Sequence, residues 1–353
     1  MTNADSRVLA VLIPVFNDWE SLRLLVRQID DALADSDWAP RLVIVDDGST
    51  EPLPADLFPR ELRTLLQIHH VELRRNLGHQ RAIAIGLFFI HAHLDAAAVL
   101  VMDGDGEDRA DSIPALLDAF DAAGGRSVVF AARAKRLEGP VFQLSYHLYR
   151  AVHRLLTGIS VRVGNFSVLP PQALARLMGV SDLWNHYAAA VFKARIPYTI
   201  LPLPRGRRLH GTSKMNFVSL LMHGLGAISV FNETVSTRIL AGTVSASCLS
   251  FAALAAAVWM RAFTDWTVPA WTVYGIGVVC IVLFQAVVFA ALFVFANIGA
   301  RSNMSFLPLR DAGYFMLQHR LLLRGNDNDR LRGHGTGRLP ESASLERLLA
   351  QTD

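Results

Sequence analysis

Four carboxylates lie within six residues of the sequence Asp103-Gly-Asp-Gly-Glu-Asp108. Negative charges at this spacing repel one another unless a cation neutralises them. Their hard oxygen atoms suit Mg²⁺ or Mn²⁺, which proteins hold jointly with substrate phosphates. An isolated acidic segment is more often a solvated turn, but this one directly follows an apolar run typical of a buried strand. The pattern therefore predicts a divalent-cation site.

A second polar motif, Asp46-Asp-Gly-Ser-Thr50, also follows a run of apolar residues. Carboxylates at the end of a strand can accept hydrogen bonds from a nucleobase imide or from ribose hydroxyls. Asp, Gly and Ser are equally favoured in a turn followed by a helix cap. Taken alone, the motif is compatible with a nucleotide contact and with a turn.

Two basic segments add positive charge. The first comprises Arg205, Arg207, Arg208, His210 and Lys214, and the second is Arg133-Ala-Lys-Arg136. Arginine forks match phosphate oxygens, and lysine adds a point charge. Anionic lipid is the alternative partner, because each basic residue near a membrane surface contributes about 1 kcal/mol. The segments therefore indicate a phosphate-containing ligand, a lipid surface or both.

Apolar runs and helical periodicity alternate along the first part of the chain. We expect strands over 7–15, 41–45, 71–73, 97–102 and 127–131, and helices over 18–33, 80–94 and 113–122. This alternation predicts an α/β fold with a Rossmann-like, mainly parallel sheet. Ligands bind such sheets at the carboxyl ends of the strands, where Asn17-Asp18, Asp46-Asp47 and Asp103 are expected to converge.

The composition is unusually apolar. Hydrophobic residues make up 52% and charged residues 18% of the 353 residues, and the mean hydropathy is +0.31. The excess lies in two uncharged stretches, at about 239–260 and 271–298, each long enough to span a bilayer. This high apolar and low charged content argues against a disordered protein or one with a nucleic-acid-binding tail. We therefore expect a transmembrane hairpin and membrane lipid as a partner, but no nucleic acid.

Arginines flank the two spans. Arg238 precedes the first, and Arg301, Arg310, Arg320 and Arg324 follow the second, whereas the short link contains Arg261 with Asp265. The positive-inside rule then places the N-terminal domain and both termini in the cytoplasm, as in a multi-pass protein of the inner membrane. The expected regions are 1–212 for the α/β domain, 213–238 for interfacial helices, 239–300 for the hairpin and 301–353 for a cytoplasmic basic segment with a polar tail.

With these motifs in order, the chain resembles family 2 glycosyltransferases of GT-A fold, most closely the membrane-bound polyprenyl-phosphate glycosyltransferases related to dolichyl-phosphate mannose synthase. The resemblance rests on Ile13-Pro-Val-Phe-Asn-Asp18, Val45-Asp-Asp-Gly-Ser49, Arg75-Asn-Leu-Gly-His79, Asp103-Gly-Asp105 and Arg208-Leu-His-Gly-Thr-Ser-Lys214. The chain departs from the family pattern at Asn165, where many relatives carry Asp. It also departs at Arg109-Ala110 and at Asn185-His-Tyr187.

The resemblance implies an inverting transfer of a sugar from a nucleotide sugar to a polyprenyl phosphate, for the synthesis or modification of cell-envelope glycans. It implies a metal on Asp103, Asp105 and Glu107, and catalytic roles for Asp105, Asn165, Arg208 and Lys214. The implied nucleotide site comprises Pro14, Phe16, Asp18, Asp46, Asp47, Asn76, Gly78 and Asp103. The implied acceptor-phosphate site comprises Arg133, Lys135, Arg136 and Ser213. A homo-oligomer, with a tetramer as one form, is also expected.

Whether Asn165 can replace the Asp of many relatives depends on the chemical nature of the acceptor. A phosphate has its second pKa near ~6, so it is already ionised at neutral pH and needs no strong general base. A hydroxyl acceptor on a lipid-linked sugar would need a carboxylate base, for which Glu107 or Asp108 is the candidate. The remaining hypothesis is a catalytically inactive membrane scaffold, against which Asp103 and Asp105 count.

Overall fold

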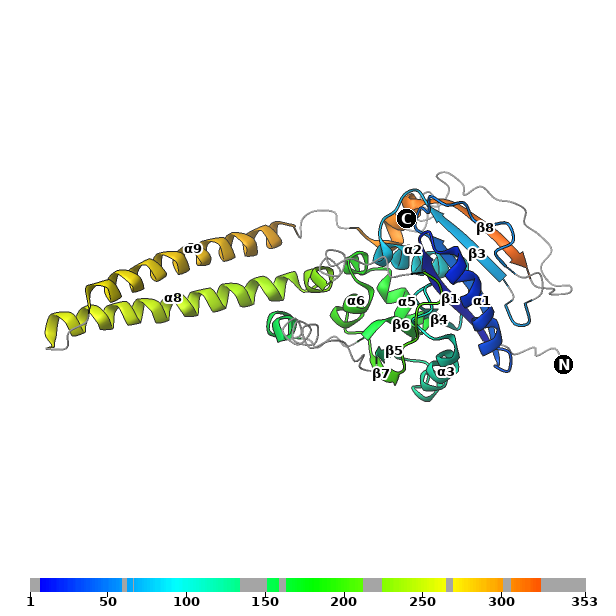
Figure 1. Ribbon diagram of the computed structural model, residues 1–353, viewed down its shortest axis with the longest axis horizontal. Coiled ribbons are helices and arrows are strands. Elements are labelled where there is room, and N and C mark those ends of the chain that lie inside the picture. The colour runs from blue at the N-terminus through cyan, green and yellow to red at the C-terminus, as the bar shows by residue number, and fades with distance from the viewer. Residues whose placement is uncertain are drawn as a thin grey trace, which may run out of the picture. The chain divides into compact units, whose positions relative to one another are not determined.

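The computed structural model describes residues 7–58, 62–65, 67–133, 151–158, 163–211, 224–264, 269–300 and 306–324 (Figure 1). The chain forms two compact units. One comprises Met1–Lys135, Arg162–Met215 and Phe306–Asp353, and the other comprises Arg136–Val161 and Asn216–Ser305. The first contains the sheet, and the second contains two long helices.

A single eight-stranded sheet organises the first unit. Its strands are β1 (Arg7–Val15), β2 (Trp38–Asp46), β3 (Gln67–Leu73), β4 (Ala98–Val101), β5 (Val128–Arg133), β6 (Val163–Leu169), β7 (Tyr198–Leu203) and β8 (Met316–Arg324). They lie in the order β7-β5-β6-β4-β1-β2-β3-β8. Strands β4, β1, β2 and β3 are mutually parallel, β5 and β7 pair in parallel, and β6 and β8 run antiparallel to their neighbours. The predicted α/β fold with a mainly parallel sheet is confirmed.

Helices cover the sheet (Figure 1). They are α1 (Trp19–Ala32), α2 (His79–His93), α3 (Ile113–Ala122), α5 (Pro171–Leu177), α6 (Tyr187–Lys193) and α10 (Pro308–Asp311), with 3₁₀ turns at Ala110–Ser112, Ser181–Trp184 and Ala312–Phe315. The central strand β1 is apolar after its first residue, Arg7, and its residues from Leu9 to Ile13 are fully buried. Helix α1 buries Leu22, Leu25 and Ile29 at helical spacing against this core. The loops at the carboxyl ends of β1, β2 and β4 therefore begin from strands in the core of the sheet.

Three strands were not predicted from the sequence. Strands β6 and β7 follow the last expected strand, and β8 lies within 301–353, which we expected to be a basic segment and polar tail. Strand β8 pairs antiparallel with β3, so the sheet recruits residues from beyond the apolar stretches. Of the interfacial helices expected over 213–238, residues 212–223 lie outside the described residues, 224–229 are helical, and α8 begins at Asn232.

The second unit contains the two apolar helices, α8 (Asn232–Phe263) and α9 (Ala270–Ala300). Both are long and apolar enough to cross a membrane. They pack side by side as an antiparallel hairpin (Figure 1), burying Ser247 and Ala257 of one helix and Cys280 and Ala290 of the other. Large apolar side chains such as Trp259, Trp271 and Phe289 remain exposed along the hairpin. An exposed apolar surface of this kind suits a lipid environment.

A histidine pair joins β8 to β3. Nδ1 of His69 lies 3.0 Å from Nε2 of His319, and the two rings stack with centroids 5.2 Å apart. Phe89 of α2 packs against both rings. Burial, together with the positive charge of His319, Arg41 and His93, lowers the pKa of His69 to about 4. The pairing of these strands therefore favours neutral imidazoles.

This cluster predicts that acid destabilises the sheet. His69 has its ordinary pKa of 6.5 when unfolded and about 4 when folded, so its contribution is fully present above pH 6.5 and is lost as the pH falls towards 4. The loss amounts to about 3 kcal/mol. The free energy of unfolding of the detergent-solubilised protein is measured as a function of pH. It should fall less steeply between pH 6.5 and 4 in His69→Gln than in wild type. His91→Gln, which changes an exposed histidine of α2, is the control, and equal declines in all three proteins would contradict the prediction.

Candidate active site

The loops after β1 and β2 are bound together at the carboxyl edge of the sheet. Asn17 adopts a left-handed backbone with φ of 49°, and its Oδ1 accepts hydrogen bonds from the backbone of Thr50 and Glu51 at 2.9 and 3.1 Å. The backbone N–H of Asn17 donates to Ser49 Oγ at 2.9 Å. Asn17 therefore fixes the Asp46 loop, and it places Asp18 beside that loop.

Asp46 and Asp47 are buried, and both carboxylates accept hydrogen bonds from backbone amides. Asp46 accepts from Ser49 N at 2.8 Å, and Asp47 accepts from Leu77 N at 2.7 Å and Gly78 N at 2.9 Å. Burial raises the pKa of Asp47. Burial also acts to raise the pKa of Asp46, but the contact with His70, whose Nε2 lies 3.6 Å from Oδ2, and the hydrogen bonds from Ser49 outweigh it, and that pKa is lowered. The structure thus shows the turn role of this motif, while a nucleotide contact by either carboxylate stays a prediction.

Glycine is required next to these carboxylates. Gly48 has φ of +70°, and a Cβ atom there would lie 2.6 Å from the backbone of Arg75 and Asn76. The loop at 75–78 can approach the Asp46 loop this closely only because position 48 lacks a side chain. The Asn76 and Gly78 backbone is thereby held at the sheet edge with Asp47.

The acidic loop, residues 103–108, follows β4 directly and is folded by its own carboxylates. Asp108 accepts from the backbone N–H of Asp103 at 3.0 Å, and Asp105 accepts from the backbone N–H of Glu107 at 3.0 Å. Asp108 is buried, whereas Asp103, Asp105 and Glu107 are half-buried. The three predicted metal ligands are therefore displayed at the edge of the sheet, and Asp108 serves to shape the loop.

Two residues that the sequence analysis missed, His79 and Gln80, lie around Asp103 and Asn165. Nε2 of His79 lies 2.9 Å from Asp103 Oδ1, and the Asn165 amide donates to the same oxygen at 3.1 Å. Gln80 donates to Asn165 Oδ1 at 3.0 Å and accepts from the backbone of Tyr187 at 2.8 Å. The signal for His79 and Gln80 was their place directly after Gly78, at the first turn of α2.

Charge is balanced locally at His79. Packing around the imidazole lowers its pKa, but the Asp103 carboxylate, with Asp108 and Asp105 further off, outweighs this effect, and the pKa of His79 is raised. Burial, together with the neighbouring Asp103, raises the pKa of Asp105, against the opposing effect of Arg208 and Arg205. The site thus gathers several carboxylates and the cations that offset them.

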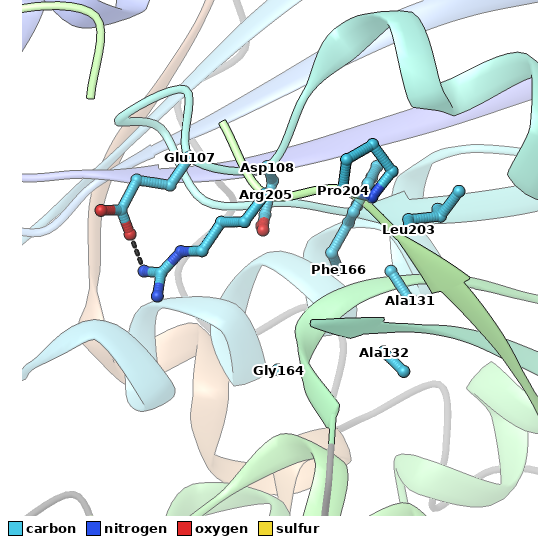
Figure 2. Close-up of a pocket in the computed structure, with 9 residues that line it drawn as sticks. All are labelled: Glu107, Asp108, Ala131, Ala132, Gly164, Phe166, Leu203, Pro204 and Arg205. Atoms are coloured by element: carbon cyan, nitrogen blue, oxygen red, sulfur yellow. Dashed lines mark ion pairs between the residues drawn. The ribbon is translucent and has the colours of Figure 1, made fainter. Parts of the chain in front are cut away.

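Two arginines of the predicted basic element contact this acidic loop. Arg208 forms ion pairs with Asp18 and with Asp105, the latter at 3.2 Å, and Arg205 pairs with Glu107, as Figure 2 shows. The Arg205–Glu107 pair borders a small pocket. This pocket is lined by Glu107, Asp108, Ala131, Ala132, Gly164, Phe166, Leu203, Pro204 and Arg205. The pocket joins the acidic loop to β5, β6 and the segment after β7, so it adjoins the predicted cation site.

The donor set fits Mg²⁺ or Mn²⁺ in its chemistry, because Asp103, Asp105 and Glu107 all supply hard oxygens. The directions of these carboxylates differ, since Asp103 faces His79, Asp105 faces Arg208 and Glu107 faces Arg205. Accordingly, no three His, Cys, Asp or Glu side chains converge on one point in the part of the chain that the structure describes. A cation at this loop requires these partners to separate.

The remaining predicted residues fall into three groups. Pro14 is buried at the end of β1, while Phe16 beside it is 39% exposed and available to a ligand. Arg133 ends β5, the strand that contributes Ala131 and Ala132 to the pocket, although only its backbone is described. The other predicted acceptor and catalytic residues, Lys135, Arg136, Ser213 and Lys214, lie outside the described residues.

Comparison with known proteins gives consistent matches. Residues 10–178 match the family model of glycosyl transferase family 2. The chain is 26% identical over 228 residues to an undecaprenyl-phosphate 4-deoxy-4-formamido-L-arabinose transferase of Erwinia tasmaniensis, covering 63% of this chain and 67% of that protein. It is 28% identical over 113 residues to a dodecaprenyl-phosphate galacturonate synthase of Rhizobium johnstonii, covering 32% of each.

Among solved structures, the chain is similar to glucosyl-3-phosphoglycerate synthase from Mycobacterium tuberculosis in complex with Mn²⁺, uridine-diphosphate-glucose and phosphoglyceric acid. The TM-score is 0.44 and the sequence identity 16%, with 66% of this chain and 79% of that chain covered.

Proposed function

We propose that the protein is a family 2 glycosyltransferase of GT-A fold, because residues 10–178 match the family model of glycosyl transferase family 2. In this proposal it transfers a sugar from a nucleotide sugar to a polyprenyl phosphate, with inversion at the anomeric carbon. The observation that carries this proposal is the meeting of the acidic loop with Arg205 and Arg208 in a chain that also has two membrane-length helices. The similar proteins from Erwinia and Rhizobium, which are named for undecaprenyl- and dodecaprenyl-phosphate, support the lipid acceptor.

The charges at the site suit departure of a nucleoside diphosphate. Negative charge develops on the leaving diphosphate as the glycosidic bond breaks, and donors aimed at that charge lower the barrier. Arg208 stands at the edge of the sheet within reach of this group, and Lys214 follows it in the same basic element. We propose that Asp103, Asp105 and Glu107 hold Mg²⁺ or Mn²⁺, which supplies positive charge opposite the diphosphate when bound. Phe16, Asp18 and the loops held by Asp46 and Asp47 are proposed to bind the nucleoside.

The surroundings of Asn165 favour a phosphate acceptor over a hydroxyl. The side chain of Asn165 is an amide that donates a hydrogen bond to Asp103, so it cannot act as a general base. Glu107 is proposed above to hold the cation, and Asp108 accepts the backbone N–H of Asp103, so neither candidate base is positioned for a hydroxyl. An ionised acceptor phosphate needs no such base. We propose that Arg133, Lys135, Arg136 and Ser213 bind this phosphate.

The proposal is tested by mass spectrometry of the lipid products. Purified protein in detergent is mixed with Mg²⁺ or Mn²⁺, polyprenyl phosphate and a panel of nucleotide sugars, and polyprenol without the phosphate serves as the matched control acceptor. We expect a glycosylated polyprenyl phosphate with one donor of the panel and no product from polyprenol. Product formed only on a hydroxyl acceptor would overturn the phosphate assignment, and complete inactivity across the panel would favour a membrane scaffold.

Membrane orientation gives a separate prediction. We propose an inner-membrane hairpin whose flanks, with the catalytic domain, face the cytoplasm, since arginines lie outside both spans. Single cysteines, Thr267→Cys in the link and Ser302→Cys after α9, are introduced into a chain whose Cys248 and Cys280 have been changed to Ala. An impermeant thiol reagent should label position 267 from the periplasmic side of intact cells, and position 302 only after permeabilisation. The reverse labelling would overturn the orientation.

A further inference from the structure

A segment of irregular backbone lies across the acidic loop. We call residues 204–211, which follow β7, the arginine strap. Its backbone donates two hydrogen bonds to the acidic loop, from Gly206 N to Glu107 O at 2.8 Å and from Leu209 N to Asp105 O at 2.9 Å. Leu209 packs over Gly106, where an added Cβ atom would collide with the leucine side chain. The strap is therefore seated on the acidic loop at several points.

Two arginines of the strap neutralise carboxylates of the predicted cation site. Arg208 lies between Asp18 and Asp105, and its own Nε donates to the His210 carbonyl at 2.9 Å. Arg205 pairs with Glu107. Arg207, by contrast, is exposed. Two guanidinium groups thus occupy the positions in which a divalent cation would meet Asp105 and Glu107.

A guanidinium and a metal ion at the same carboxylate repel each other, because both are positive and both lie close to it. Both oxygens of Asp105 already accept hydrogen bonds, Oδ2 from Arg208 and Oδ1 from the backbone N–H of Glu107, so a cation that binds Asp105 competes with the Arg208 pair. A diphosphate offers the released arginine a better partner, since guanidinium groups bind phosphate oxygens through paired hydrogen bonds. Cation binding and diphosphate binding would then assist each other, and such coupling is reciprocal.

We propose that Arg208 and the divalent cation compete for Asp105, so that the strap keeps the acidic loop neutralised until a diphosphate draws the arginines away. This inference rests on the proposed function for the identity of both ligands. In this arrangement the strap has two tasks in turn: it replaces the cation when the site has no donor, and it binds the donor diphosphate when the cation is present. Free divalent cations bind weakly to the protein alone.

The test measures Mn²⁺ binding without any nucleotide, by electron paramagnetic resonance of the unbound ion. The variant Arg208→Gln is expected to bind Mn²⁺ about tenfold more tightly than wild type or more, because one charge-assisted bond to Asp105 no longer has to be broken. Arg207→Gln, which removes a charge from the same strap, should match wild type. The double variant Arg208→Gln with Asp105→Asn should lose the gain, which assigns the new affinity to Asp105.

Two further variants guard against misfolding. Arg208→Lys retains a positive charge and should keep the weak Mn²⁺ binding of wild type, and Arg205→Gln tests the Glu107 pair independently of position 208. Melting temperatures establish that each variant is folded. Equal Mn²⁺ affinities in wild type, Arg208→Gln and Arg205→Gln would overturn the competition but leave the proposed transferase intact. If none of these proteins bound Mn²⁺ even with nucleoside diphosphates present, both the competition and the proposed cation site would be wrong.

Discussion

The variant Asp105→Asn is expected to transfer sugar at least about a hundredfold more slowly than wild type, because it removes a carboxylate that we propose holds the cation opposite the leaving diphosphate. Asp105 is half-buried, and its burial with the nearby Asp103 raises its pKa, so the neutral amide should not destabilise the fold. Initial rates of product formation and the melting temperature are measured side by side. Nucleotide-dependent Mn²⁺ binding should be lost together with turnover.

A matched control for this prediction lies a short way further along the chain. Asp111 is exposed, pairs with Arg109 and does not contact the acidic loop carboxylates in the part of the chain that the structure describes. Asp111→Asn makes the same chemical change and should retain the wild-type rate. Wild-type turnover in Asp105→Asn would rule out the assignment of Asp105 as the cation ligand.

The variant Arg133→Ala is expected to raise the apparent KM for polyprenyl phosphate by roughly 10- to 150-fold, equivalent to the ~1.5–3 kcal/mol of a lost charge-assisted bond. Two anionic substrates need separate positive contacts, or their repulsion would keep them apart. We propose the strap for the donor diphosphate and Arg133, which ends β5, for the acceptor. Nucleotide affinity, measured by titration, should therefore stay nearly unchanged.

The control for Arg133 is Arg126→Ala, just before the opposite end of the same strand, which should leave both substrates unaffected. The variant Asn165→Asp distinguishes a phosphate acceptor from a hydroxyl acceptor. If the acceptor is a phosphate, the restored carboxylate should not greatly raise the transfer rate. The acceptor assignment would be wrong if wild type did not glycosylate polyprenyl phosphate and Asn165→Asp steeply raised the rate on a hydroxyl acceptor.

The fold was predictable where local pattern and tertiary environment agree. Strand β1 is apolar from Val8 onward because helices cover both faces of the sheet, and helix α1 shows a clear apolar stripe, so both were expected close to their observed bounds. Strand β6 reads Val-Gly-Asn-Phe-Ser-Val-Leu, in which Gly and Asn conceal a strand that exists because β4 and β5 pair with it. Pairing between distant segments overrides local propensity in such cases.

The candidate site shows the same division. Asp103 and Asp105 were identified because their residue types and their place after an apolar run are local properties. The contact of His79 with Asp103 and that of Arg205 with Glu107 join residues from distant parts of the chain, and nothing in the spacing of either pair indicates it. The sequence also left open whether Asp47 touches a ligand, whereas the structure commits both of its carboxylate oxygens to the backbone of Leu77 and Gly78.

The position of β8 in the sheet constrains how often the chain can cross a bilayer. Strands β1 to β7 precede the two apolar helices and β8 follows them, yet all eight are hydrogen-bonded in one sheet. A sheet cannot be divided between two aqueous compartments, because its backbone groups would have to pair through hydrocarbon. The number of crossings between β7 and β8 must therefore be even, and a single added or deleted span would place β8 across the membrane from β3. The pairing of β8 with β3 thus requires an even number of membrane crossings between β7 and β8, whatever charges flank the helices.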